Sequence, residues 1–422
     1  KLSAPCHPEA MLVTPGPLSR IAPAAAPPPR LHTGGVAAAA MAALLLLSPL
    51  QMIAPAALHT QVAQARELAS GSGSKVNKDP NSLLRLGLPG QPKEVRELQS
   101  GLEGCQDNLS RLLFSKANGD LANARAVLSG KSAAILKKVP AASVPEAEKL
   151  LASMATKTEK LAQLISGGRV SDETTEVQNA ALADLSKLEG LIAATTPPVK
   201  VPAEFAAIPQ LNKRAVVEFI AKKGPNAESS TFNIDGNLFK TATLRMEIDG
   251  YTSPVTAGNF IDLVNKGFYN DMKIQRSDGF VVQTGDPSQE GRGKDVGFVP
   301  QGSDKVRTVP LEVFVKNDKG PIYGTTFDDD SRGGYAATLP FNAYGALGMA
   351  RGEYDTDSGS SQFFWLLFDS DLTPAGKNLL DGRYSCFGYT TEGARFLSDL
   401  KEGDIIQSAK VIEGLDNLVQ PK

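Results

Sequence analysis

The spacing of apolar residues changes once along this chain, at a proline-rich segment that includes Pro197-Pro198. Before this segment, apolar residues recur every three or four positions, which is typical of one face of an α-helix. After it, Leu244, Met246 and Ile248 alternate with charged residues, the pattern of a strand with one face in water. The change of period predicts two modules of different class, an all-α module and a mainly β module, joined by a stiff linker over 195–212.

The first module, predicted over 80–194, contains three clear helical faces. Their apolar positions are Val95, Leu98, Leu102 and Leu109; Leu150, Met154, Leu161 and Ile165; and Val177, Leu182, Leu185, Leu188 and Ile192. The sequence Ser143-Val144-Pro145-Glu146 predicts a capping box, and Gly167-Gly168 predicts a helix end before the next helix begins near Ser171. The breaks every twenty-odd residues favour an antiparallel bundle of about four helices over a coiled coil.

The second module, predicted over 213–422, combines short strands with a helix. A helical pattern over 256–266 buries Phe260, Leu263 and Val264. Several short apolar stretches follow, separated by glycine and proline turns. We therefore expect an antiparallel β-barrel with flanking helices.

The first 65 residues are predicted to be a targeting region. They are poor in acidic residues and contain an apolar run, Val36 to Leu47, followed by Ala63-Gln64-Ala65. A transit-type segment followed by an export signal with a small-residue cleavage site predicts passage through two membranes, the plastid envelope and then the thylakoid. The apolar run is shorter than the ~20 residues needed to span a bilayer. Cleavage would leave a mature chain that begins near Arg66, with a flexible tether over 66–79.

Composition excludes several classes of function. The formal net charge of −2 argues against a nucleic-acid partner. The three histidines are His7, His32 and His59, so the rest of the chain has no histidine for a metal site or a catalytic triad. We expect no metal and no cofactor. A Cys105–Cys386 bridge is conceivable in an oxidising compartment, but isolated buried thiols are favoured.

The stretch QRSDGFVVQTGD, residues 275–286, places polar groups beside an apolar strand. Arg276 and Gln283 each need a partner or a ligand there. A structural interpretation pairs Arg276 with Asp278 and bonds the Gln283 amide to the backbone. A functional interpretation places both residues on the wall of a binding pocket.

Several motifs in the second module favour the functional interpretation. They are Pro254-Val255-Thr256-Ala257-Gly258-Asn259-Phe260, Gly267-Phe268-Tyr269, the stretch 275–286, Ser360-Ser361-Gln362-Phe363-Phe364, Leu380-Asp381-Gly382-Arg383-Tyr384 and Phe387-Gly388. In this order, across 213–415, they resemble a cyclophilin. The whole chain resembles the multidomain cyclophilins of the thylakoid lumen, a family associated with peptidyl-prolyl isomerisation and with assembly and repair of photosystem II.

The resemblance implies a site and a mechanism. The implied catalytic residues are Arg276, Phe280 and Gln283, and the implied substrate-binding residues are Val281, Ala350, Arg351, Gln362, Phe364, Leu379, Leu380 and Tyr384. An X-Pro bond isomerises slowly because its C–N bond is partly double. An arginine that donates to the proline nitrogen or to the twisted carbonyl would stabilise the transition state without any proton transfer.

Three departures from the family pattern bear on turnover. Leu379 occupies the usual tryptophan position, Tyr384 replaces a histidine, and Gln275 replaces the histidine that precedes the arginine in human-type enzymes. An extra segment over 295–319 also enlarges a loop. Isomerase activity could therefore be weak or lost while peptide binding survives.

Three functions follow from these expectations. The protein is a lumenal prolyl isomerase, an assembly chaperone that holds proline-containing segments of lumenal or thylakoid membrane proteins such as photosystem II subunits, or a scaffold in which the helical module binds partners. The short linker further predicts that the helical module packs on or beside the cleft and limits access to it.

Overall fold

The computed structural model describes residues 76–291, 296–368 and 378–421. The predicted targeting region, most of the tether, Cys6 and the three histidines lie outside the described residues. Within the described ranges, no helix is both long enough and apolar enough to cross a bilayer.

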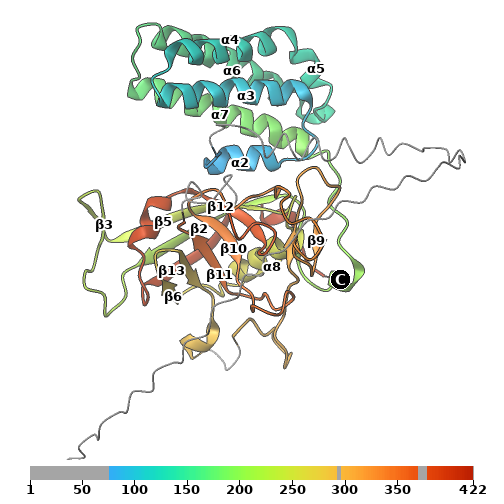
Figure 1. The fold of residues 1–422 in the computed structure, drawn as a ribbon, viewed down its shortest axis with the longest axis vertical. Coiled ribbons are helices and arrows are strands. Elements are labelled where there is room, and N and C mark those ends of the chain that lie inside the picture. The colour runs from blue at the N-terminus through green and yellow to red at the C-terminus, as the bar shows by residue number, and fades with distance from the viewer. Residues whose placement is uncertain (1–75, 292–295, 369–377, 422) are drawn as a thin grey trace, which may run out of the picture. The chain divides into compact units, whose positions relative to one another are not determined.

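Six helices form the first module: α2 (Pro80–Gly87), α3 (Lys93–Ser110), α4 (Phe114–Gly130), α5 (Ser132–Leu136), α6 (Val144–Ile165) and α7 (Asp172–Ala193). The four long helices α3, α4, α6 and α7 pack side by side, with α3 against α4 and α7, and α6 against α4 and α7 (Figure 1). The predicted bundle is confirmed, because the three helical faces are buried in it, Val177 partly.

The start of α6 differs from the prediction. Ser143 ends a short 3-10 turn, Ala141–Ser143, that runs directly into α6, and its side chain makes no capping hydrogen bond. Its φ and ψ of −101° and −2° are far from the extended conformation that a capping residue needs. The capping box expected at Ser143 is therefore wrong. A reciprocal box forms instead between Ser171 and Thr174, at the start of α7.

The second module is a closed eight-stranded antiparallel barrel, as predicted. Its strand order is β10-β11-β7-β6-β13-β2-β5-β12. The bounds are β2 (Arg214–Lys222), β5 (Thr241–Asp249), β6 (Met272–Ser277), β7 (Val281–Thr284), β10 (Ala346–Met349), β11 (Phe363–Leu366), β12 (Cys386–Glu392) and β13 (Ile405–Glu413). Closure leaves none of these eight strands with an unpaired edge.

Shorter elements complete this module. Three two-stranded pairs join β1 (Gln210–Leu211) to β14 (Leu418–Val419), β3 (Phe232–Ile234) to β4 (Asn237–Phe239), and β8 (Glu312–Val313) to β9 (Ile322–Tyr323). Helix α8 runs over Pro254–Asn265, so it begins two residues before the predicted start. Because β1 falls in the predicted linker and pairs with β14, the last residues of that segment belong to the β module.

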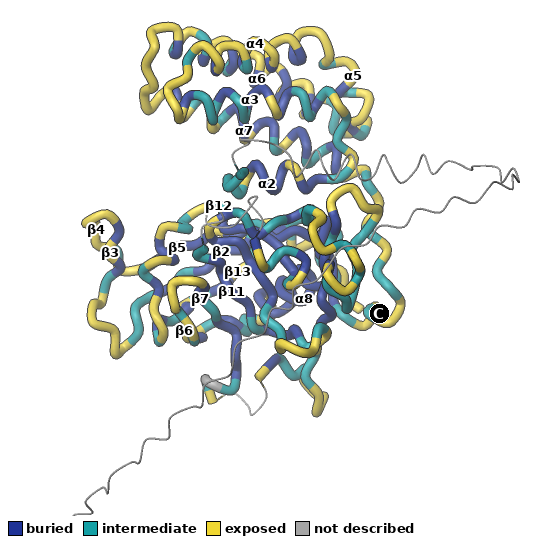
Figure 2. The backbone as a smooth tube through the Cα atoms, in the orientation of Figure 1, coloured by how far each residue is buried: buried dark blue, intermediate teal, exposed yellow. Residues whose placement is uncertain are grey.

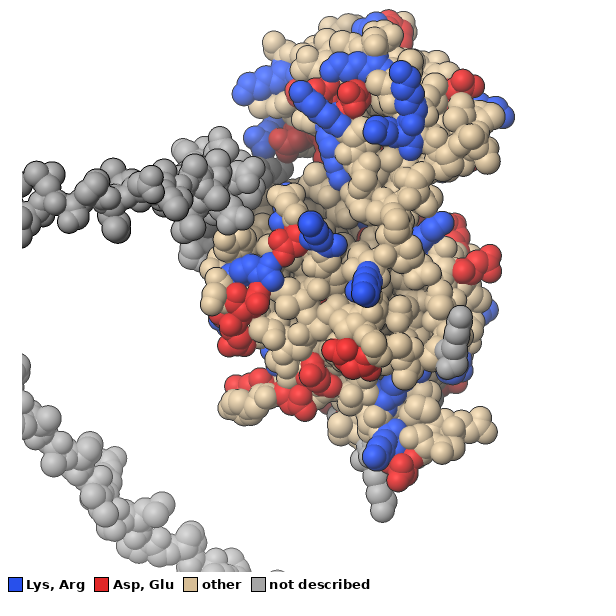
Figure 3. All heavy atoms as spheres, turned by 90° about the vertical axis from the view of Figure 1, so that its right-hand side faces the viewer, with Lys and Arg blue, Asp and Glu red and all other residues tan. Residues whose placement is uncertain are grey.

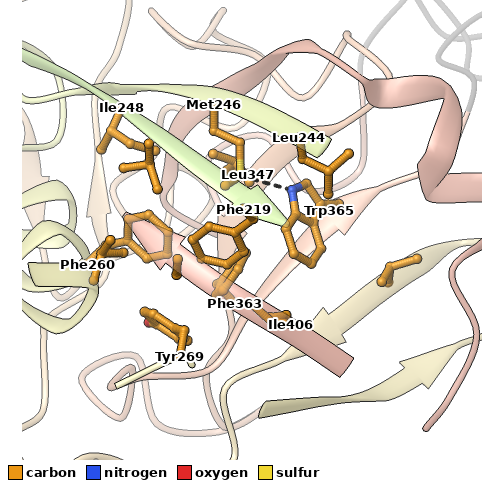
Figure 4. Packing of buried hydrophobic residues seen from close by; sticks show 14 of the residues in the cluster. Phe219, Leu244, Met246, Ile248, Phe260, Tyr269, Leu347, Phe363, Trp365 and Ile406 are labelled. Carbon is orange, nitrogen blue, oxygen red and sulfur yellow. Dashed lines mark hydrogen bonds between the residues drawn. The ribbon is translucent and has the colours of Figure 1, made fainter. Parts of the chain in front are cut away.

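Inward-facing residues of the barrel strands form its core, which Figure 2 shows as the dark blue strands and α8. Phe219 lies against Phe260, Phe363 and Trp365, with ring centroids 6.0–6.2 Å apart (Figure 4). The Trp365 indole donates to the Met246 sulfur at 3.2 Å. Trp365, the only tryptophan in the chain, is therefore a core residue outside the cleft.

Helix α2 connects the bundle to the barrel. Leu83 and Leu84 are 4% and 2% exposed and pack in an apolar cluster with residues of the barrel's outer face. Arg214 of β2 donates to the Leu84 carbonyl at 2.6 Å. The same cluster contains Val281 and Phe364, two residues of the predicted substrate site, and α2 itself packs against β12. Restriction of access by the helical module stays a prediction.

Candidate active site

Four residues on four neighbouring strands form a single row across the barrel. Gly348 of β10 is the register partner of Phe364 on β11, Phe364 pairs with Gln283 on β7, and Gln283 pairs with Arg276 on β6. Adjacent strands lie ~4.8 Å apart, so the row spans roughly 14 Å. The structure thus brings together Arg276, Gln283 and Phe364, which the sequence places up to 88 residues apart.

A β-bulge determines the direction of Arg276. Between Ile274 and Arg276 the register of β6 against β7 shifts, so that Gln275 is an extra residue on β6. Ile274 is buried in the barrel core, and regular alternation would turn Arg276 to the same interior face. The bulge instead leaves the Arg276 side chain 52% exposed. This local irregularity places a charged group at the surface of the cleft.

Successive side chains of strand β11 point to opposite faces of the barrel, one into the core and the next towards the candidate site. Phe363 belongs to the barrel core, whereas Phe364 lies in the outer cluster with Val281 and is 5% exposed. The predicted division of these two phenylalanines is confirmed. The Phe364 ring stacks on Phe341 at 6.0 Å and meets Tyr384 edge-on at 5.7 Å. An apolar floor of this kind suits a proline ring.

Gly348 makes room for that floor. A Cβ atom on Gly348 would lie 2.2 Å from Cζ of Phe364 and within 2.7 Å of both Cε atoms. The ring therefore covers the backbone of β10, and only glycine leaves the necessary space. No sequence pattern indicates this requirement, because it depends on the pairing of two strands that are distant along the chain.

Other predicted substrate residues surround this floor unevenly. Ala350, Leu380 and Tyr384 are partly buried against the same outer cluster. Phe280 is 36% exposed, and its ring lies 5.4 Å from Phe368. Leu379, however, is 73% exposed, so this predicted substrate residue contributes little packed surface to the site.

Two glutamines donate to the side-chain oxygen of a third beside the row. Gln275 and Gln283 both donate to Oε1 of Gln362, at 2.7 and 2.9 Å, and Gln362 donates in turn to the Val296 carbonyl. The amide of Gln283 is thus engaged by a side chain and not by the backbone. The N–H of Ala350 donates to the carbonyl of Gln362 at 3.0 Å, so this donor is already used.

Charged groups line the cleft. Arg351 lies over the Tyr384 ring, 4.9 Å from its centroid, and donates to the Arg383 carbonyl. Arg276 forms an ion pair with Asp278, as the structural interpretation predicted. Slight burial would raise the pKa of Asp278, but the N–H of Val281, the Arg276 guanidinium and the N–H of Phe280 together hold that pKa below its usual value. Asp278 is therefore ionised at any physiological pH.

A buried carboxyl lines a small cavity together with Phe341 and Tyr384. Glu312 is fully buried and accepts hydrogen bonds from the N–H groups of Val255 and Thr256, at the start of α8. Burial raises the pKa of Glu312 to about 7, although these two N–H donors oppose the shift. This group can titrate near neutral pH.

Other polar clusters show no arrangement for a metal. Among the described residues, no group of three or more Cys, Asp or Glu side chains could hold a metal ion. In the acidic run, Asp328 pairs with Arg383, Asp330 pairs with Arg332, and Asp329 accepts a hydrogen bond from Thr326. Cys105 and Cys386 are buried free thiols, as favoured from the sequence.

Comparisons with known proteins agree with this geometry. Residues 231–417 match the family model "Cyclophilin type peptidyl-prolyl cis-trans isomerase", and residues 79–192 match "Peptidyl-prolyl cis-trans isomerase CYP38-like, PsbQ-like domain". A thylakoid lumen peptidyl-prolyl cis-trans isomerase of Synechocystis sp., sll0408, is 41% identical over 81% of this chain and 84% of its own length. The chain belongs to the cyclophilin-type peptidyl-prolyl cis-trans isomerases.

Two chloroplastic cyclophilins of Arabidopsis thaliana extend the comparison. CYP38 is 39% identical over 82% of this chain and 76% of its own length. CYP37 is 30% identical over 85% of this chain and 75% of its own length. These matches cover the helical module together with the barrel, which confirms the resemblance to multidomain cyclophilins and the thylakoid lumen as the location. The roles of individual cleft residues in this cyclophilin stay predictions.

Proposed function

We propose that this lumenal cyclophilin is a folding and assembly factor that binds X-Pro segments of photosystem II subunits and retains part of the isomerase site. The observation that supports it most directly is the row from Gly348 to Arg276, which sets an apolar floor beside a guanidinium. The match of the helical region to a CYP38-like, PsbQ-like domain supports a role beyond that of a single-domain isomerase.

The row explains how isomerisation would proceed. The proline ring rests on Phe364, and Arg276 donates to the proline nitrogen as the C–N bond twists and loses conjugation. A rotation needs no proton acceptor, which is consistent with a cleft that contains no histidine. Arginine presents a rigid fork of permanently charged donors, so lysine should replace it poorly.

The proposal is tested with the purified chain in a protease-free isomerisation assay on a proline peptide. We expect Arg276→Ala and Arg276→Lys to lower kcat/KM by at least ~10²-fold, the range of a single transition-state donor. Arg245→Ala is the matched control, because Arg245 is a comparably exposed arginine, on β5 outside the row. Equal rates in the wild type and both Arg276 variants would refute the catalytic role.

The client class needs a separate test. Synthetic lumenal loops of photosystem II subunits that contain X-Pro should bind in titration calorimetry, and the same loops with alanine in place of proline should bind more weakly. Binding that ignores both the proline and Arg276 would contradict the proposal.

A second function is an inert peptide-binding chaperone or scaffold. Two observations favour it: the ion pair of Arg276 with Asp278, and the exposure of Leu379. Under this alternative, loop peptides bind in a proline-dependent way while no variant shows turnover.

A further inference from the structure

Two nitrogens of the Arg276 guanidinium are directed at one carboxylate. Nε and Nη2 of Arg276 lie 2.6 and 2.5 Å from Oδ2 of Asp278. These are the donors that a twisting X-Pro amide would require. The side-chain N–H of Gln283, the register partner of Arg276, donates to Gln362.

The turn itself holds the Asp278 carboxylate in place. Its second oxygen, Oδ1, accepts the N–H groups of Phe280 and Val281, both at 2.9 Å. Gly279, which follows Asp278, has a φ of +82°, which glycine adopts without strain. One oxygen of Asp278 is therefore fixed by the β6–β7 turn, and the other faces the arginine two residues earlier.

We propose that Asp278 is a positioning residue that holds Arg276 in a resting orientation and thereby limits turnover. The inference rests on the proposed function and adds its regulation. While the pair is formed, the charge of Arg276 is neutralised and its donors are occupied, so a bound X-Pro amide must compete for them. A carboxylate beside the arginine also weakens the positive potential that would stabilise the developing lone pair on the proline nitrogen.

Exposure limits the strength of this restraint. The two side chains are 52% and 39% exposed, so water and salt screen the pair. Releasing such a pair should raise the rate by about 2- to 5-fold, which corresponds to ~0.4–1 kcal/mol. The restraint therefore lowers turnover without abolishing it, and its effect should shrink as ionic strength rises.

The decisive variant is Asp278→Asn in the full chain. The asparagine side-chain oxygen can still accept the N–H groups of Phe280 and Val281, so the turn is preserved while the charge is removed. Asp235→Asn is the matched control, because Asp235 lies in the exposed β3–β4 turn with a φ of +52° that asparagine also tolerates.

Rates are measured with a proline peptide at about 0.05 M and about 0.5 M NaCl. We expect Asp278→Asn to raise kcat about 2- to 5-fold at low salt, with a smaller gain at high salt. The wild type and Asp235→Asn should both speed up with salt. The gain should vanish in the double variant Arg276→Ala/Asp278→Asn, which a merely structural role of Asp278 would not predict.

Other outcomes overturn the inference in distinguishable ways. If the wild type is active and Asp278→Asn, with an unchanged melting temperature, is equally active or slower, then Asp278 does not restrain Arg276, and the proposed function stands. If the wild type and Asp278→Asn are both inactive, the inference and the catalytic part of the proposed function fail together. An inactive wild type with an active Asp278→Asn variant would also overturn the inference, because a screened pair of this exposure can slow turnover only a few-fold.

Discussion

Gly348→Ala should disturb the cleft although it adds one methyl group outside the predicted set of site residues. The new Cβ would lie 2.2 Å from the Phe364 ring, far inside van der Waals contact. The ring cannot retreat easily, because it is 5% exposed and packs against Phe341 and Tyr384. Overpacking of this kind costs ~1–3 kcal/mol, and loss of backbone freedom in the unfolded chain offsets ~0.4–1 kcal/mol.

The net expectation is a loss of up to about 2.6 kcal/mol in the free energy of unfolding. Proline-peptide affinity should fall by roughly 2- to 10-fold, because an aromatic contact of ~0.5–1.5 kcal/mol is displaced. Denaturant unfolding and titration calorimetry measure the two effects. Gly119→Ala is the matched control, because Gly119 is exposed in α4. A methyl group there would meet no atom within 4 Å beyond its chain neighbours and its own helix backbone, so this substitution should stabilise the chain by ~0.5–1 kcal/mol.

A double-mutant cycle with Phe364→Leu isolates the contact. A leucine at position 364 leaves space for the new methyl group, so the two substitutions should couple by ~0.5–3 kcal/mol. Additive costs, or a Gly348→Ala variant as stable as Gly119→Ala, would refute the argument that the Phe364 ring occupies the space above β10.

Three further predictions concern the buried acid, the pocket wall and helix α2. Since burial raises the pKa of Glu312 to about 7, the stability that this group contributes is fully present below its unfolded-state pKa and is lost as pH rises through about 7. Thermal unfolding between pH 4.5 and 7.5 should therefore show a loss of stability on the order of 3 kcal/mol in the wild type that is absent in Glu312→Gln. Parallel pH curves for the two proteins would contradict this prediction. Cyclosporin-type cyclic ligands should bind the wild type weakly, because the exposed Leu379 lacks an indole donor, and calorimetry should show ~1 kcal/mol or more of additional binding free energy in Leu379→Trp. Tight binding by the wild type without improvement in the variant would contradict this prediction. Leu84→Ala should loosen the packing of α2 and increase peptide affinity. Leu121→Ala removes an equally buried side chain inside the bundle and should lower the free energy of unfolding without changing peptide affinity. Equal peptide affinity in both variants would argue against restriction of the site by the helical module.

The sequence by itself determined the class of each module and most of the cleft composition. Apolar spacing is a local property, and a period of 3.6 or 2 decides which face of a segment can be buried, so the α3, α6 and α7 faces and strand β5 were predictable. The ordered motifs around Arg276 and Phe364 similarly identified the family. The capping box at Ser143 failed because a preceding 3-10 turn fixed the backbone there, which side-chain pattern alone does not reveal.

Tertiary structure decided how those residues act together. The row from Gly348 to Arg276 exists only because four strands pair in one register, and the space that Gly348 leaves for Phe364 follows from that pairing. The bulge at Gln275 turns the Arg276 side chain to the opposite face of the sheet, and no glycine or proline at that position indicates the bulge in the sequence. Basic and acidic side chains are interspersed on the face shown in Figure 3. The amino-acid composition alone therefore could not predict which acidic residue forms an ion pair with a given arginine or lysine. The choice of Asp278 over Gln283 as the partner of Arg276 depends on ångström-scale geometry, which a one-dimensional pattern does not contain.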